Sequence, residues 1–434
     1  MILILDIGKT NKKCFVFDED YQVVFEQTTQ LPETTDEDGD PCEDISLLTT
    51  WVEQTRQEVL SNARFQIHAV NVATYGASLV HLDAAGQPVA PLYNYLKPFP
   101  EELKEQFLKS NGGVEKVTLE TASPMLGMLN SGLQLYWLKY RKPIVFERIK
   151  CTLHLPQYIS LLVESGGDFE SSPDCAIDIT SLGCHTMLWD FQKKDYHDWV
   201  KREGIVEKFP PMIQLGGNYI GIPFRVSNQT TNIQIGPGIH DSSAALIPYL
   251  MTFEEPFVLI STGTWCISLN PFNHEPLTDD ELAQDCLCYL SQTGQPVKAA
   301  RYFGGYTHEL RVKELAAAFG VGEDFYKSVQ LSESLKLSES YVAFMRQLVE
   351  NQVVSTRLAL GDSPVRRIFV DGGFSKNEVY MTLLAQSFPQ LEICAAEVAQ
   401  ATSLGAALAI HSCWNKKSLP KNLISLKKYP VLLP

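Results

Sequence analysis

The chain has 434 residues, of which 45% are hydrophobic and 20% charged, the balance of an ordinary globular protein. This length exceeds what one core normally serves, so we expect two domains, over residues 1–248 and 249–434. The formal net charge of −15 argues against a nucleic-acid partner, because phosphate backbones attract an excess of Lys and Arg.

Neither a signal segment nor a membrane span is predicted. The apolar run after Met1 is cut by Asp6 and has no basic flank, and no stretch approaches the ~20 apolar residues that a span needs. We therefore expect a cytoplasmic protein with no membrane partner. The ten cysteines lack zinc-site spacing, which favours buried, reduced thiols.

Apolar runs alternate with helical periodicity along the N-terminal part, which indicates an α/β protein. The acidic, turn-rich stretch 34–44 is expected to be an exposed loop. We predict strands at 2–6, 14–17, 22–27 and 69–73, and helices at 45–63, 130–140 and 155–164.

The pattern restarts in the second part of the chain. We predict strands at 257–260, 265–269 and 367–370, a helix at 377–387, and an Ala-rich helix after Gly405. The two units strand–polar loop–strand, at 2–17 and 257–269, resemble each other in pattern. They suggest two related halves with a boundary near residues 246–256.

Three polar loops that follow apolar strands have residue types suited to phosphate chemistry. In 6–11 an acid is followed by glycine and a hydroxyl, so that backbone N–H groups and Thr10 could face an anion while Asp6 holds hydrated Mg²⁺. The loop 261–264 repeats the hydroxyl and glycine, and two such hairpins could hold phosphates from both sides. At 371–373 two glycines would let a flat ring approach the backbone.

A fourth element supplies a candidate base. Residues 236–241 end in Asp241, followed by the small residues 242–245. Phosphoryl transfer needs positioning, charge neutralisation and an acceptor for the proton of the attacking hydroxyl. The alternative role for Asp241 is a helix N-cap, and the two roles are compatible.

Taken in order, these motifs resemble the FGGY carbohydrate kinases. The matching residues are Asp6-x-Gly8-x-Thr10, Gly238-x-His240-Asp241, Ser261-Thr262-Gly263-Thr264-Trp265, Asp371-Gly372-Gly373 with Asn377, and Ala401-Thr402 with Gly405-Ala406-Ala407. The resemblance implies two ribonuclease-H-like domains of the actin-like ATPase fold. It also implies that these domains close over the substrates, with sugar bound by residues 1–248 and nucleotide by 249–434.

The resemblance further implies a role for each matching residue. Asp241 would be the catalytic base, and Mg²⁺ would lie near Asp6 and Asp241. The sugar would contact Thr74, Tyr75, Gly76, Ala77, His240 and Asp241. ATP would be held by Gly8, Lys9, Thr10, Asn11, Thr262, Gly263, Thr264, Gly372, Gly373 and Asn377.

Within the family, Gly76 and 263–265 are most similar to the L-fuculose and L-rhamnulose kinases, which implies phosphorylation of a primary hydroxyl of a 6-deoxyketose. The segment 93–98 departs from the acid–arginine pattern common after the sugar loop. The alternatives are a pentulose (xylulose- or ribulose-type) kinase, an actin- or chaperone-like ATPase, and an inactive sugar-binding relative. The sequence does not decide the oligomeric state, and a homodimer stays open.

Other conspicuous side chains are interpreted as structural. His81, His154, His185 and His308 lack the spacing of metal ligands. Trp137 and Trp189 lie on apolar segments, which favours core packing over a sugar platform.

Overall fold

The computed structural model describes residues 1–165, 177–210, 224–225, 233–331, 335–397 and 400–430. The chain divides into two compact units. The first consists of Met1–Pro248, Cys288–Gln295 and Gln400–Lys421, and the second of Tyr249–Leu287, Pro296–Ala399 and Asn422–Pro434. The units are therefore not two continuous halves, because two later segments belong to the first unit.

A mixed sheet forms the centre of the first unit. Strand β1 pairs parallel with β6 and antiparallel with β2, and β3 follows β2 at the edge. The predicted strands at 2–6, 14–17, 22–27 and 69–73 are confirmed. The seven strands are β1 Ile2–Ile7, β2 Lys12–Phe17, β3 Val23–Thr29, β6 Ala69–Thr74, β11 Phe224–Arg225, β12 Gln234–Ile235 and β13 Ile239–His240.

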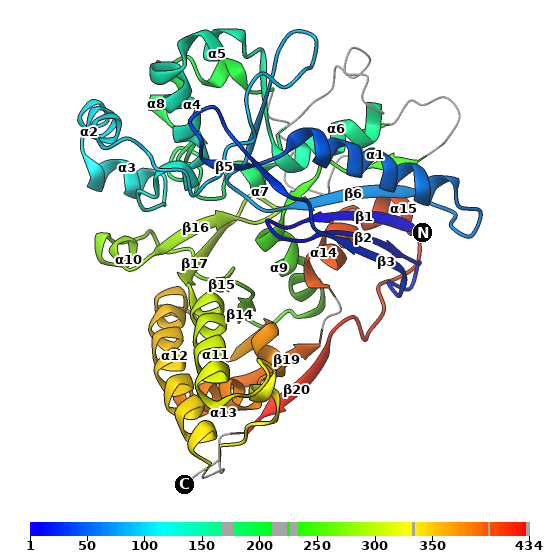
Figure 1. The fold of residues 1–434 in the computed structure, drawn as a ribbon, viewed down its shortest axis with the longest axis vertical. Coiled ribbons are helices and arrows are strands. Elements are labelled where there is room, and N and C mark those ends of the chain that lie inside the picture. Colours follow the sequence, from blue (N-terminus) through cyan, green and yellow to red (C-terminus); the bar gives the residue numbers. More distant parts are fainter. Residues whose placement is uncertain (166–176, 211–223, 226–232, 332–334, 398–399, 431–434) are drawn as a thin grey trace. The chain divides into compact units, whose positions relative to one another are not determined.

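Helices cover both faces of this sheet (Figure 1). Helix α1 (Ile45–Ser61) packs on α6 (Leu155–Ser165), which lies on β6, while α14 (Ala401–Ala409) contacts β1 and β6. Asp44 begins α1 by accepting the N–H groups of Ser46 and Leu47 at 2.9 and 3.0 Å. The other helices that lie wholly in this unit are α2 Glu101–Ser110, α3 Val114–Glu120, α4 Ser131–Arg141, α5 Pro143–Arg148, α7 Ile179–Leu182, α8 Asp198–Arg202 and α15 His411–Trp414.

The expectation of an exposed loop at 34–44 is wrong in part. This stretch forms a hairpin of β4 (Glu33–Thr35) and β5 (Pro41–Glu43), and Asp36 at its turn is buried. The reason is Lys97, whose buried ammonium pairs with the carboxylates of Asp36, Asp40 and Asp38 at 2.6, 2.7 and 3.1 Å. A partner some sixty residues away cannot be seen in a local pattern. Lys97 also explains part of the unusual segment 93–98, because it neutralises this acidic turn.

Two short strand pairs and the predicted tryptophans complete the first unit. Strand β7 (Leu79–Leu82) pairs with β8 (Cys151–His154), and β9 (Trp189–Asp190) pairs with β10 (Asp195–Tyr196). Trp137 and Trp189 are both buried in one hydrophobic cluster, as expected.

The second unit is built on a sheet of order β16-β17-β15-β14-β18-β19-β20. Helix α12 packs against β15, β17 and α13, and α11 packs against α12 (Figure 1). The strands of this sheet are β14 Phe257–Thr262, β15 Cys266–Asn270, β17 Pro296–Tyr302, β18 Arg367–Gly372, β19 Glu392–Glu397, β20 Ser425–Tyr429 and β16 Cys286–Leu290, whose last three residues are counted with the first unit. The helices are α10 Asp279–Ala283, α11 Gly304–Phe319, α12 Lys336–Leu360 and α13 Glu378–Ser387.

The two units repeat one local arrangement. In the first, β1 forms a hairpin with β2 and runs parallel to β6; in the second, β14 forms a hairpin with β15 and runs parallel to β18. The similarity of pattern between residues 2–17 and 257–269 therefore corresponds to equivalent positions in two sheets.

Two expected absences can be examined in the described part of the chain. No helix there is long and apolar enough to cross a membrane. None of the nine described cysteines forms a disulfide bond.

Candidate active site

Three strand ends in the first unit bring the predicted residues of that unit to one edge of its sheet. The register pairs Ile7 of β1 with Thr74 of β6, and Thr74 with His240 of β13, all in parallel. Because parallel strands end at the same edge, the segments 8–11, 74–77 and 240–241 follow one another along that edge. The sequence predicted these segments separately, and the topology places them together.

The first loop is a tight hairpin turn between β1 and β2. The Gly8 N–H donates to the Asn11 carbonyl at 2.9 Å, and Thr10 at the turn is exposed. The Lys9 ammonium pairs with Glu33 at 2.6 Å and lies 5.9 Å from the centroid of the Tyr75 ring. Thr10 therefore presents its hydroxyl to solvent, whereas Lys9 is held by a carboxylate.

A buried ion pair supports this hairpin from below. The Lys12 ammonium pairs with Glu43 and donates to the carbonyls of Gly8 and Lys9 at 3.2 and 3.1 Å. The Tyr75 hydroxyl donates to the other oxygen of Glu43. The side chains of Lys12 and Glu43 are only 2% and 4% exposed. Through these contacts β2, β5 and the end of β6 fix the backbone of the loop.

Two aspartates of this edge have raised pKa values. Burial raises the pKa of Asp6 to about 6. Two smaller effects lower this pKa: a hydrogen bond from the Ser403 hydroxyl at 2.7 Å and the positive charge of Lys13. The charge of Asp241 adds to this rise, so the two carboxylates interact. Raised pKa values in a mutually repelling pair indicate a place suited to a cation.

Asp241 is the first residue of α9 (Asp241–Thr252). Its Oδ1 accepts the Ser242 N–H at 2.6 Å and the Ser242 hydroxyl at 3.3 Å. Burial raises the pKa of Asp241 to about 6, and the bonds from Ser242 act in the opposite direction. About a third of the side chain (34%) is still exposed, so a substrate can reach a carboxylate that is otherwise surrounded by protein. The helix-start role and the base role are compatible here.

The residues expected to contact a sugar differ in their exposure. Thr74, Tyr75 and Ala77 are buried, whereas Gly76 is half-buried. A Cβ at Gly76 would lie 3.0 Å from both Cys184 Sγ and His240 Nε2, so a side chain there would collide with both. The backbone at Gly76 is therefore the part of 74–77 that a ligand can approach, and the neighbouring side chains build the strand end.

The second unit has an equivalent edge, where Thr262 of β14 pairs with Gly372 of β18. The Thr262 hydroxyl donates to the Asp371 carbonyl and accepts the Phe374 N–H at 3.0 Å. Gly372 has φ +84°, and a Cβ there would lie 1.9 Å from the Thr262 carbonyl oxygen. Only glycine fits at this crossing. Thr262 thus ties the two loops together, and the exposed Gly263 and Thr264 form the tip of the hairpin.

A cavity of about 210 Å³ opens beside these loops, within the second unit. Apart from Gly373 and its two chain neighbours, no heavy atom of the described residues lies within 4 Å of where a Cβ of Gly373 would be, so a ring could stack there. Asn377 is mostly buried, caps α13 and donates to the Tyr341 hydroxyl at 2.8 Å. The lining residues are Thr262, Gly263, Gly305, His308, Tyr326, Gly373, Phe374 and Asn377.

Several of the residues that build these sites were not predicted from the sequence. His308, interpreted as structural, lines the cavity; its Nε2 lies 2.8 Å from the Tyr341 hydroxyl, and burial lowers its pKa to about 4, so it is neutral at pH 7. Lys12 and Glu43 are ordinary charged residues in the sequence. Only the two-residue period of a strand, which places Lys12 on the same face as Cys14 and Val16, could have suggested that Lys12 points inward. Cys184 has no sequence signal at all.

Comparison with known proteins assigns the family. The model of the FGGY family of carbohydrate kinases, N-terminal domain, matches residues 1–247, which is more than half of the chain. The model of the FGGY C-terminal domain matches residues 254–330. This chain belongs to the FGGY family of carbohydrate kinases. The resemblance noted in the sequence is therefore confirmed.

One curated relative of this FGGY chain is the rhamnulokinase of Halalkalibacterium halodurans, with 22% identity over 277 residues. The match covers 61% of this chain and 55% of the rhamnulokinase, so it spans little more than half the length of that relative.

Two solved structures show the same fold over nearly the whole FGGY chain. Ligand-bound xylulose kinase from Lactobacillus acidophilus aligns with TM-score 0.78 and 15% identity, over 99% of this chain and 94% of the other. Plasmodium falciparum glycerol kinase with ADP aligns with TM-score 0.72 and 16% identity, over 95% and 90%. The expected two-domain α/β fold of the actin-like ATPase type is confirmed.

Proposed function

We propose that this chain transfers the γ-phosphoryl group of ATP to a primary hydroxyl of a ketose, with Asp241 as the base. The observation that carries the proposal is the shared sheet edge in the first unit, where Asp6 lies near the end of β1 and the Gly76 backbone and Asp241 follow β6 and β13. Family membership supports the reaction class.

Asp241 would take the proton of the attacking hydroxyl. Its Oδ1 is occupied by the two hydrogen bonds from Ser242, which orient the carboxylate at the start of α9. We assign the proton to Oδ2. The hydroxyl oxygen bonds to the γ-phosphorus while the bond to ADP breaks, and the proton that balances this exchange goes to Asp241.

The residues present fit ATP and Mg²⁺. Carboxylate oxygens are the donors that Mg²⁺ prefers, and Asp6 and Asp241 offer two at one edge. When bound, the ion neutralises phosphate charge. Gly8, Lys9, Thr10 and Asn11 in the first unit, and Thr262, Gly263 and Thr264 in the second, would bind the phosphates. Gly372, Gly373 and Asn377 would line the adenosine site. That the two hairpins meet around one ATP stays a prediction.

The nucleotide site can be tested at Gly373. Substitution by Ala would place a methyl group in the cavity without touching protein. We expect the KM for ATP to rise about tenfold, or ~1.4 kcal/mol, because the methyl displaces the base. Melting temperature and the KM for sugar should stay unchanged. An equal rise in both KM values would show that the cavity is not the nucleotide site.

The proposed sugar is a 6-deoxyhexulose such as L-rhamnulose or L-fuculose. The rhamnulokinase relative and the similarity at Gly76 and 263–265 support this choice. The fold neighbour named as a xylulose kinase supports a pentulose as the alternative. An ATPase without a sugar acceptor, or an inactive sugar-binding relative, is a different class of function.

A coupled ADP-release assay separates these possibilities. The panel should hold L-rhamnulose, L-fuculose, L- and D-xylulose, and L- and D-ribulose, each with MgATP. Turnover with a 6-deoxyhexulose at a kcat/KM at least tenfold above the pentuloses would support the proposal. A pentulose preference would replace the substrate, ADP release without sugar would favour an ATPase, and binding of sugar without turnover would favour an inactive relative.

A further inference from the structure

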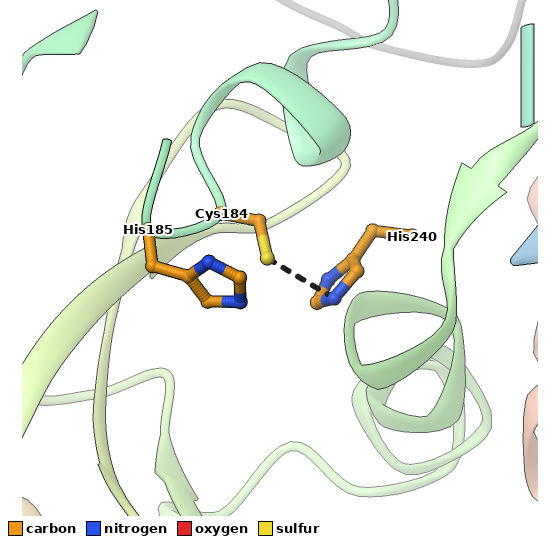
Figure 2. Close-up of side chains that lie close together, drawn as sticks. All are labelled: Cys184, His185 and His240. Carbon is orange, nitrogen blue, oxygen red and sulfur yellow. Dashed lines mark hydrogen bonds between the residues drawn. The ribbon is translucent and has the colours of Figure 1, made fainter. Parts of the chain in front are cut away.

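A cysteine and two histidines meet inside the first unit, beside Asp241. Cys184 and His185 follow the short helix α7, and His240 ends β13. One ligand atom from each of the three lies within 4.8 Å of the other two, and all three residues are buried. In Figure 2 the Cys184 sulfur lies between the two imidazole rings. Two separate segments of the chain thus bring three nitrogen and sulfur donors together.

Hydrogen bonds around His240 direct its lone pair toward the sulfur. The Ser243 hydroxyl donates to the Leu290 carbonyl at 3.4 Å, so its oxygen can accept a hydrogen from His240 Nδ1 at 3.3 Å. A neutral imidazole with hydrogen on Nδ1 has its lone pair on Nε2. This Nε2 lies 3.1 Å from Cys184 Sγ.

The same nitrogen has a second electron-rich neighbour. Asp241 Oδ1 lies 3.2 Å from His240 Nε2. Nitrogen, sulfur and oxygen therefore converge, and the same Oδ1 also accepts the hydrogen bonds from Ser242. A cation among these atoms would be attracted to all three.

His185 has the hydrogen-bond arrangement of a metal ligand. Its Nδ1 lies 3.0 Å from the Leu129 carbonyl. A carbonyl can only accept, so Nδ1 carries the hydrogen and the lone pair is on Nε2. A backbone carbonyl that holds one ring nitrogen is the usual support for a histidine that binds metal through the other.

The spacing and the available space also fit a transition metal. Bonds of ~2.0–2.3 Å in a tetrahedron place ligand atoms roughly 3.3–3.8 Å apart, close to the 3.1 Å between Cys184 Sγ and His240 Nε2. Gly76 lies next to both of these atoms, and a Cβ at this position would be 3.0 Å from each of them. Its bare backbone leaves room on that side of the cluster.

We propose that Cys184, His185 and His240 bind a divalent transition metal of the zinc class, with the fourth position toward Asp241. One thiol and two imidazoles suit zinc better than magnesium, which prefers oxygen ligands. Binding releases the thiol proton to solvent. The resulting thiolate and the Asp241 carboxylate then balance the two positive charges, which makes the buried charge tolerable.

Bound metal would block the site described above. An ion that shares Asp241 occupies the carboxylate proposed as the base, so zinc is expected to inhibit sugar phosphorylation. This consequence rests on the proposed function. The metal site itself does not, because its residues and distances are independent of which reaction the chain performs.

The test is a titration of the full chain with Co²⁺ as a spectroscopic substitute for zinc. Thiolate coordination gives a sulfur-to-cobalt charge-transfer band, which needs no enzyme activity. We expect the band to saturate at one Co²⁺ per chain and to disappear on addition of Zn²⁺. In Cys184→Ser the band should be absent, and in His185→Gln binding should weaken at least tenfold.

Two control variants make the assignment specific. Cys151→Ser removes a thiol that is more accessible than Cys184 and should leave the band intact. His197→Gln disrupts the other described cluster, Glu120, Asp190 and His197, which has no sulfur and should not affect the band. Melting curves without metal show whether each variant is folded. A band that survives in folded Cys184→Ser, or no band at a tenfold excess of Co²⁺, would overturn the proposal.

The inhibitory consequence has a separate measurement. Each protein is assayed with its preferred sugar at constant excess Mg²⁺, with and without Zn²⁺, and compared with its own zinc-free rate. With Zn²⁺ present, the phosphorylation rate of the wild type should fall at least tenfold, and that of Cys184→Ser should fall less than twofold. An active wild type that binds Co²⁺ through sulfur but keeps its rate in Zn²⁺ would refute the inhibition. If no sugar is phosphorylated, the proposed function fails while the Co²⁺ band still decides the site.

Discussion

Replacing Asp241 with Asn is expected to lower kcat for sugar phosphorylation by a factor of about 10²–10⁴, the usual contribution of a general base. The amide keeps an oxygen that can accept the bonds from Ser242 but cannot take up the hydroxyl proton. The KM for ATP should change less than kcat, because the cavity proposed for adenosine belongs to the second unit. The assay is initial-rate kinetics with the sugar chosen from the panel.

The matched control is Asp190→Asn, another buried aspartate of the first unit. Asp190 Oδ1 accepts the N–H groups of Gln192 and Lys193 at 3.0 and 2.9 Å, which an Asn oxygen can also do. Activity within about threefold of wild type is expected. If both variants lost activity equally, or if Asp241→Asn kept more than a tenth of kcat, Asp241 would not be the base.

The pH profile provides an independent test of the same group. Burial raises the pKa of Asp241 to about 6, so the free enzyme holds the base ionised above that pH and protonated below it. We therefore expect kcat/KM for the sugar to fall as the pH drops below about 6. Asp6 also has a pKa of about 6 and interacts with Asp241, so this limb belongs to the pair. A flat profile down to pH 5 would contradict the assignment.

Most of the fold could be predicted because it depends on local patterns. Buried strands have mainly apolar runs, such as residues 2–5 of β1, and helices such as α1 show their period and their Asp44 cap. The polar loops after these strands could be predicted one by one, but their shared edge follows from the pairing of β1, β6 and β13, which the structure shows. Family resemblance added the roles, which the local chemistry alone left open.

The features that could not be predicted from the sequence depend on contacts between residues far apart in the chain. Lys97 neutralises Asp36 and so buries a turn whose composition is that of a surface loop. Cys184 contacts His240 because α7 and β13 are adjacent in the fold. The two residues are 56 positions apart in the sequence and do not form a metal-binding motif that could be recognised there. The Thr262 hydroxyl, which the sequence suggested for phosphate binding, also joins two loops in the folded chain, and the sequence did not predict that second role.

Lys12 to Met is expected to be the most destabilising of the charge substitutions in the first hairpin, by about 3–5 kcal/mol. The ammonium forms an ion pair with Glu43 and donates hydrogen bonds to the carbonyls of Gly8 and Lys9. Met fills similar volume but leaves the Glu43 carboxylate buried after its ammonium partner is removed, while the Tyr75 hydroxyl still donates to it. A loss of this size corresponds to about 10 °C in melting temperature for a unit of this length.

Lys9 to Met in the same turn is the matched control. Its ion pair with Glu33 is partly exposed, at 23% and 46%, and such pairs contribute about 0–1 kcal/mol. Adding Glu43→Gln to Lys12→Met should recover part of the loss, because the uncompensated charge is then removed. If instead the two lysine variants melted at the same temperature, the buried pair would not hold the hairpin. If Lys12→Met is the less stable of the two, this variant should also raise the KM for ATP. Lys12 fixes the backbone of Gly8 and Lys9, which would face the phosphates.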